Sequence, residues 1–176
     1  MSHLEAALSA ATVLLTAVCA YLAYRQYAAL RGYRQPPVTV YGTREEITAH
    51  FPEILARAAR GDAVFGQCRL GAGYPPQFYE ALTAAAGRGV KLQALVPDKP
   101  DTAQLRERLA GLDPNRVSVR VTDGAYSASL LGIRGREVLV TSHQADKIVG
   151  VLFEDPLLCR YMELAYDAVW DRSRPA

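Results

Sequence analysis

Apolar positions along most of this chain follow two periods, which predict helices that alternate with short strands. Apolar residues recur three and four positions apart, the spacing of one helix face, in the segments 43–60, 75–88, 102–112 and 156–170. Apolar runs bounded by turn residues predict strands at 38–41, 63–70, 91–96, 117–122, 127–133, 137–142 and 147–153. This order predicts an α/β fold in which a mixed sheet is flanked by helices.

Two of the predicted helices carry signals for their ends or their buried faces. Thr43, with Glu46 three residues later, fits a capping box at a helix start. Pro52 interrupts the apolar pattern of that helix and predicts a kink or a restart. The last helix should begin at Asp155 and Pro156. Its expected buried face consists of Leu158, Met162, Ala165, Tyr166, Val169 and Trp170.

An uncharged segment, Ala6–Tyr24, precedes the domain and predicts one transmembrane helix. A helix of these 19 residues spans roughly 28 Å, close to the hydrocarbon thickness of a bilayer. The tyrosines at its C-terminal end and the arginines that follow suit the cytoplasmic side of a membrane. We therefore expect a single-pass membrane protein. Residues 1–35 would form the anchor and linker, and residues 36–176 the cytoplasmic domain.

Three alternatives for this segment stay open. A signal peptide could be cleaved near Val18, Cys19 and Ala20, although the basic start typical of such peptides is lacking. Cys19 could also be a lipoprotein site, but Val18 is a poor fit before it. The segment could instead be a buried or amphipathic helix docked on the domain. Its polar residues share one face, which could equally be a helix contact within the bilayer.

Composition and charge narrow the function only slightly. Half of the residues are hydrophobic and 22% are charged, which suits a folded core. The net charge of +2 is too small to indicate nucleic-acid binding. Cys19, Cys68 and Cys159 are scattered without the spacing of metal ligands. We therefore expect reduced, buried thiols, no metal site and no cofactor.

The predicted hairpin around Arg134 carries the functional information. Ser127 and Ser129 lie on its first strand, and Thr141–Gln144 ends its second strand. This frame resembles one half of a phospholipase D-like domain, and the likeness covers roughly residues 47–172. In that family the hairpin carries His-x-Lys-x4-Asp, then Gly, then Gly-Ser-x-Asn. The spacing matches here, but Ser127, Ser129 and Arg134 stand where the family has His, Lys and Asp.

The resemblance implies that the family's catalytic groups are missing. Its reaction resembles nucleophilic catalysis by an imidazole, with lysines that hold the phosphate. A serine at position 127 would need an adjacent base, and none is aligned with it. We therefore expect no catalytic residue. The candidate ligand-binding residues are Ser127, Ser129 and Arg134, the family-like Ser142 and Gln144, and Arg69 at the end of a strand.

Active members of the family need two half-sites, and this chain carries one. We therefore expect a homodimer or a hetero-partner that meets the chain through the degenerate-site face. The expected function is a membrane-anchored, catalytically inactive phospholipase D-like domain that acts as an interaction, sensing or assembly module. One alternative is a phosphodiesterase or nuclease whose site is rearranged around His143 and Lys147, in an expected loop, or completed by a partner. Another is a regulator that binds a small phosphate- or sugar-containing ligand.

Overall fold

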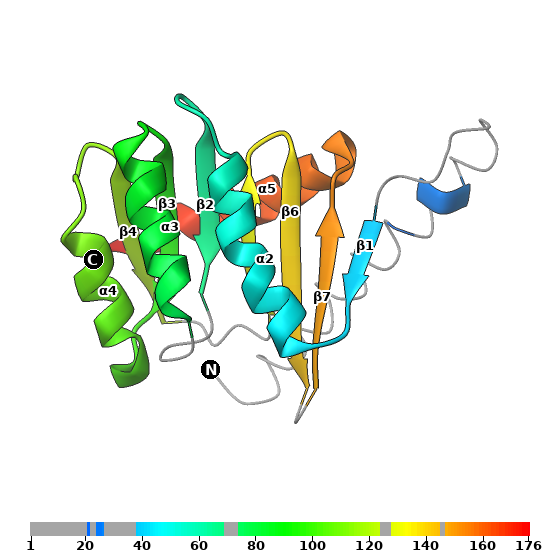
Figure 1. Cartoon of the computed structure of the whole chain (residues 1–176), viewed down its shortest axis with the longest axis horizontal. Coiled ribbons are helices and arrows are strands. Elements are labelled where there is room, and N and C mark those ends of the chain that lie inside the picture. Colours follow the sequence, from blue (N-terminus) through cyan, green and yellow to red (C-terminus); the bar gives the residue numbers. More distant parts are fainter. Residues whose placement is uncertain (1–20, 22–23, 27–37, 69–73, 124–127, 145–146) are drawn as a thin grey trace.

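One eight-stranded sheet organises the fold, and helices cover both of its faces (Figure 1). The computed structural model describes residues 21, 24–26, 38–68, 74–123, 128–144 and 147–176. The strands are β1 (Val38–Tyr41), β2 (Ala63–Gln67), β3 (Lys91–Pro97), β4 (Val117–Thr122), β5 (Ala128–Ile133), β6 (Glu137–Gln144), β7 (Lys147–Phe153) and β8 (Arg174–Pro175). The helices are α2 (Arg44–Arg57), α3 (Pro76–Gly87), α4 (Ala103–Ala110) and α5 (Pro156–Trp170), with a 3-10 turn at Pro100–Thr102.

The sheet is mixed, as the sequence predicted. Its strand order is β1-β7-β6-β5-β2-β3-β4-β8. The central strand β2 pairs in parallel with β3, which pairs in parallel with β4, because helical crossovers connect these strands. On its other side β2 pairs antiparallel with β5, which leads through hairpins to β6 and β7. The helices α2, α3 and α4 lie on one face, and α5 lies on the other (Figure 1).

Helix α2 begins as predicted and continues through its proline. The Thr43 side chain accepts a hydrogen bond from the Glu46 backbone, and the Glu46 carboxylate accepts one from the Thr43 backbone. Pro52 lies inside the helix, which continues to Arg57 without a restart. Phe51 and Leu55, on either side of it, are buried. We attribute the continuity to this burial, because packing can offset the missing N–H of a proline.

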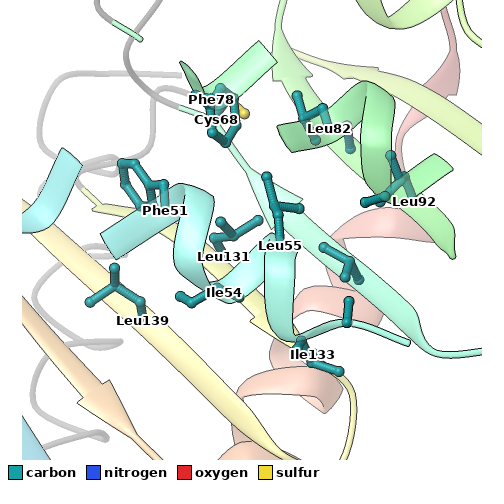
Figure 2. Close-up of a cluster of buried hydrophobic side chains, with 14 of the residues drawn as sticks. Phe51, Ile54, Leu55, Cys68, Phe78, Leu82, Leu92, Leu131, Ile133 and Leu139 are labelled. Carbon is teal, nitrogen blue, oxygen red and sulfur yellow. The ribbon is translucent and has the colours of Figure 1, made fainter. Parts of the chain in front are cut away.

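The core is divided between the two faces of the sheet. The larger cluster lies under α2 and α3, and the members labelled in Figure 2 are Phe51, Ile54, Leu55, Cys68, Phe78, Leu82, Leu92, Leu131, Ile133 and Leu139. The smaller cluster lies under α5 and consists of Phe65, Leu95, Val138, Cys159 and Tyr166. Cys68 and Cys159 are free and buried, which confirms the prediction for these two thiols. Burial raises the pKa of each to about 11.

The structure corrects several boundaries. Strand β6 extends to Gln144, so His143 and Gln144 belong to a paired strand and not to the expected loop. Strand β7 begins at Lys147, as the apolar pattern predicted, so Lys147 is also paired and is not in a loop. The two-residue strand β8 pairs with β4 and was not predicted. On α5, Ala165 is exposed whereas Glu163 is buried, the reverse of the predicted pattern.

The predicted membrane segment lies almost entirely outside the described residues. Tyr21 and Tyr24–Gln26 are helical. Within the part of the chain that the structure describes, every helix is too short or too polar to cross a bilayer. The Tyr24 hydroxyl donates a 2.9 Å hydrogen bond to the carboxylate of Asp155, at the start of α5.

Candidate functional site

Ser129 and Ser142 of the predicted motif lie at the same end of the β5–β6 hairpin, away from its turn. Ala128 pairs with Ser142, and Ser129 pairs with Thr141. Gln67, at the end of β2, reaches the same place and donates a 3.4 Å hydrogen bond to the carbonyl of Ala128. This end of the sheet therefore brings Ser129 and Ser142 onto neighbouring strands, as the family-like spacing requires.

Ser129 is a buried residue of the sheet. Its exposed fraction is 1%, and Thr141 beside it is fully buried. The Thr141 hydroxyl donates to the carbonyl of Ser129 at 3.4 Å. Both residues alternate in step with Leu131 and Leu139, so they face the core under α2 and α3. A ligand could reach the Ser129 side chain only if the surrounding side chains moved.

The remaining candidates at this end are described only in part. Ser127 and Arg69 lie outside the described residues. For His143, Gln144 and Lys147 the structure describes the backbone: His143 pairs with Ile148, and Gln144 pairs with Lys147. The strands therefore place these three residues at the serine end of the hairpin.

Arg134 lies at the opposite end of β5 and takes part in a different set of contacts. It lies five positions after Ser129, which corresponds to about 17 Å along a strand. Its guanidinium donates two hydrogen bonds to Asp167 of α5, at 2.6 and 3.1 Å, and one to Gln93 of β3 at 2.8 Å. The structure therefore does not bring Arg134 and Ser129 together within one chain.

The Arg134 side chain is held between aromatic rings and a carboxylate. Its Cζ atom lies 5.2 Å from the ring centre of Phe65 and 5.9 Å from that of Tyr166. The hydrogen bonds to Asp167 raise the pKa of Arg134 above its ordinary value. Their effect on the pKa is larger than the opposing effect of burial. Such an arginine is charged at every accessible pH, and its donors are directed at protein groups. In this conformation it stabilises the turn and is not directed toward a ligand.

A second carboxylate of α5 fixes the same turn. Glu163, one helical turn before Asp167, is 3% exposed and accepts a 2.6 Å hydrogen bond from the backbone N–H of Gly135. Gly135 has a φ of 73°, a conformation that favours glycine. The turn of the hairpin is thus attached to α5 at two successive residues.

We expect the Arg134–Asp167 contact to be stronger than an ordinary surface ion pair. It is bidentate and only 25% and 38% of the two side chains is exposed, so a double-mutant cycle with alanine at both positions should give a coupling energy of about 1–2 kcal/mol. The control cycle uses Arg136 and Asp62, a single contact at 2.9 Å with an arginine that is 47% exposed. That pair should give at most about 0.5 kcal/mol. Equal couplings in the two cycles would contradict the role assigned to Arg134.

A polar cluster that the sequence did not single out lies on α2. His50, Glu53 and Arg57 follow one another at helical spacing, which was the available signal. His50 Nδ1 lies 2.7 Å from a Glu53 carboxylate oxygen. Arg57 donates to His50 Nε2 at 3.2 Å and makes two hydrogen bonds with the buried Glu137.

This cluster joins α2 to the sheet. The hydrogen bonds to Glu137 raise the pKa of Arg57, so its charge is permanent. Arg57 lies 3.2 Å from Nε2 of His50 and Glu53 lies 2.7 Å from Nδ1, so both ring nitrogens are engaged by neighbouring side chains. The network connects α2 to the start of β6. Within the described residues, no group of three metal-ligating side chains comes together.

A surface groove of about 590 Å³ lies between α3 and α4. Arg108 lies over the ring of Tyr79, with Cζ 4.6 Å from the ring centre. Glu80 and Gln104 also line the groove. These side chains form no pair of nucleophile and base, and α3 and α4 place the groove on the sheet face opposite α5 (Figure 1).

The sheet order, the hairpin and the closing helix define an α/β domain with the phospholipase D-like fold. Nuc from Salmonella typhimurium, a phospholipase D family member, matches with a TM-score of 0.61 and 17% identity over 81% of this chain and 99% of that chain. NucT from Helicobacter pylori matches with a TM-score of 0.65 and 11% identity, covering 80% of this chain and 99% of that chain. At these identities the likeness concerns the fold. No protein-family model and no curated protein matches the sequence.

Two larger proteins share the fold over part of their length. TrmBL2, an archaeal chromatin protein described by its mode of DNA binding, matches with a TM-score of 0.64 and 14% identity over 94% of this chain and 66% of that chain. A phosphatidylserine synthase from Haemophilus influenzae matches with a TM-score of 0.56 and 13% identity over 74% of this chain and 37% of that chain. The fold therefore occurs in a phospholipid-modifying enzyme and in a protein described by binding.

Proposed function

We propose that this chain is a catalytically silent phospholipase D-like module, attached to a membrane by residues 6–24, whose domain faces the cytoplasm and acts in interaction, sensing or assembly. The main support for the proposal is the residue that occupies the family's lysine position and its burial. That position is Ser129, which is 1% exposed and lies within the sheet. A hydroxyl in this environment supplies neither the charge nor the access that phosphate binding needs.

The chemistry of phosphodiester cleavage supports this proposal. The family-like mechanism needs an imidazole nucleophile and cationic groups around the phosphate. The loss of one such electrostatic group typically costs roughly 10²–10³ in rate. At the described positions of the motif, Ser129 replaces a cation and Arg134 is committed to Asp167. The likeness to TrmBL2, a protein described by binding, is consistent with a role that does not require turnover.

Binding at the motif end would use the groups that reach its surface. Ser142 is half-buried at the end of the hairpin, beside the strand ends that carry Gln144 and Lys147. A second copy or a hetero-partner that joins this end would double the set of polar groups and could enclose a phosphate- or sugar-containing ligand. The mass of the full chain in detergent, measured by light scattering, tests for the homodimer.

Purified full chain in detergent should not hydrolyse bis(p-nitrophenyl) phosphate faster than buffer. The chain in which Ser142 is replaced by alanine provides the matched blank, because this change removes the remaining family-like hydroxyl. Absorbance of released nitrophenolate measures the rate. Turnover that exceeds the blank and is abolished by His143→Ala would overturn the proposal and favour the alternative enzyme with a rearranged site.

A further inference from the structure

Helix α5 carries a second apolar face that nothing in the described structure covers. Leu157, Tyr161 and Leu164 are 53%, 53% and 49% exposed. They follow one another at spacings of four and three, and the exposed Ala165 and Ala168 continue the same side of the helix. We call these five residues the outer stripe of α5.

The outer stripe is unusual for a helix at the surface of a domain. Leu158, Cys159 and Tyr166 already form the face that packs against the sheet. A helix that is apolar on both sides is normally covered on both sides. Of the six large hydrophobic side chains that are strongly exposed among the described residues, three belong to this one stripe. Such concentration of exposed apolar groups typically marks an interaction site.

The chain itself indicates what lies next to the stripe. Tyr24 is the last residue of the uncharged segment 6–24, and its hydroxyl donates a 2.9 Å hydrogen bond to Asp155. Asp155 caps α5, because its side chain accepts from the backbone N–H groups of Leu157 and Leu158. The end of the apolar segment and the first residue of the outer stripe are therefore joined through one side chain.

We propose that the outer stripe of α5 lies in the lipid interface of the membrane to which the segment 6–24 attaches the chain. This inference rests on the proposed membrane attachment. If Tyr24 is at the level of the headgroups, Asp155 is there too, and α5 can lie in the membrane plane over its length of about 22 Å. Leucine and tyrosine are suited to this position, since one end of a tyrosine is apolar and the other is polar.

The flanking charges fit this orientation. Arg160 is 61% exposed at the side of the stripe and lies 3.4 Å from one carboxylate oxygen of Glu163, and its long side chain can leave this contact to bring its charge to the headgroups. The other oxygen of Glu163 and the carboxylate of Asp167 are directed to the hairpin turn. With α5 on the membrane, the opposite face of the sheet, which carries α2, α3 and α4, points into the aqueous phase (Figure 1).

The experiment uses the full chain in liposomes that contain phosphatidylcholine with brominated acyl chains, which quench tryptophan on contact. The variant Tyr161→Trp places a reporter on the stripe. The matched control, Gln77→Trp, places one at an exposed position of α3, on the opposite face of the sheet. Trp170 is present in every sample, so each variant is compared with the unmodified chain. We expect the added fluorescence of Tyr161→Trp to fall at least twofold in brominated lipid and that of Gln77→Trp to remain unchanged.

Two further measurements separate this inference from the membrane attachment. Changing both Leu157 and Leu164 to glutamate in the Tyr161→Trp chain should abolish the quenching, while extraction with alkaline carbonate still leaves the chain in the membrane. A carbonate-resistant chain without quenching at position 161 would overturn the inference alone. A chain that carbonate extracts would overturn the proposed attachment, whatever the quenching shows. Disulfide cross-linking between copies through Leu164→Cys, without quenching, would assign the stripe to a second copy and overturn the inference.

Discussion

Replacing Phe65 with alanine should lower the free energy of unfolding by about 3–5 kcal/mol. The Phe65 side chain is fully buried, its ring lies edge-on to that of Tyr166 at 5.0 Å, and the guanidinium of Arg134 lies over it. The substitution therefore opens a cavity under α5 and removes one of the rings that hold Arg134. Urea denaturation of the full chain in detergent, followed by circular dichroism and by Trp170 fluorescence, measures the change.

Two controls make the Phe65 result specific. Phe65→Leu conserves most of the volume and should cost less than about 1.5 kcal/mol. Val40→Ala removes a side chain that is 66% exposed on β1 and should change stability by at most about 0.5 kcal/mol. A Phe65→Ala chain as stable as these controls would mean that the cluster under α5 does not hold the hairpin turn.

Local patterns in the sequence predicted most of the fold. Apolar runs predicted every strand from β1 to β7. The signal is clearest for β2 and β3, because strands buried on both faces are nearly continuous hydrophobic segments. The capping box at Thr43 and the aspartate cap at Asp155 are encoded within three or four residues, and both are present. Signals of this kind depend on neighbours along the chain, so they are visible without the tertiary structure.

The features that the sequence did not predict depend on residues that are distant along the chain. Strand β8 consists of Arg174 and Pro175, which carry no apolar pattern and are ordered by pairing with β4. The sequence around Glu163 is typical of a polar position on a surface helix. In the structure Glu163 is buried, and its carboxylate accepts a hydrogen bond from the backbone N–H of Gly135. Leu157 and Leu164 lay outside the buried face predicted for α5, but only the structure shows that both side chains remain about half exposed.

Arg134 shows how the candidate site was predicted in part. The sequence predicted that Arg134 lies in the turn of a hairpin, and the structure confirms this turn between β5 and β6. Its partner Asp167 lies 33 residues away, so the sequence could not show that the guanidinium is already engaged. The prediction placed Ser129 and Arg134 in one site because they belong to one motif. In the structure they lie near opposite ends of β5.

Among the described residues, side chains of α5 and α2 hold the turn end of the hairpin. Glu163 and Asp167 fix the turn at Gly135 and Arg134, and Arg57 binds Glu137 next to it. The serine end depends on strand pairing and on the hydrogen bonds that Thr141 and Gln67 donate. The frame can therefore persist when serines occupy positions 127 and 129 of the motif.

Gly132→Ala tests how closely the two strands of this hairpin must approach and should destabilise the chain by about 3 kcal/mol. Gly132 lies opposite Val138 on β6, and a Cβ atom added there would lie 2.5 Å from the carbonyl oxygen of Glu137 and 3.0 Å from a methyl group of Val138. The nearest obstacle is backbone, so it cannot be relieved by turning a flexible side chain. The strands would have to separate near the turn that α5 holds.

Gly87→Ala is the matched control for this substitution, and it should have the opposite sign. An added Cβ atom at Gly87, in the last turn of α3, meets nothing within 4 Å. The alanine should therefore stabilise the chain by about 0.5–1 kcal/mol, because it restricts the unfolded chain and favours the helix. Urea denaturation under identical conditions compares the two variants. If Gly132→Ala proves as stable as Gly87→Ala, the close approach of β5 and β6 does not exclude a side chain at position 132. The inference that the two strands cannot separate near the turn would then be wrong.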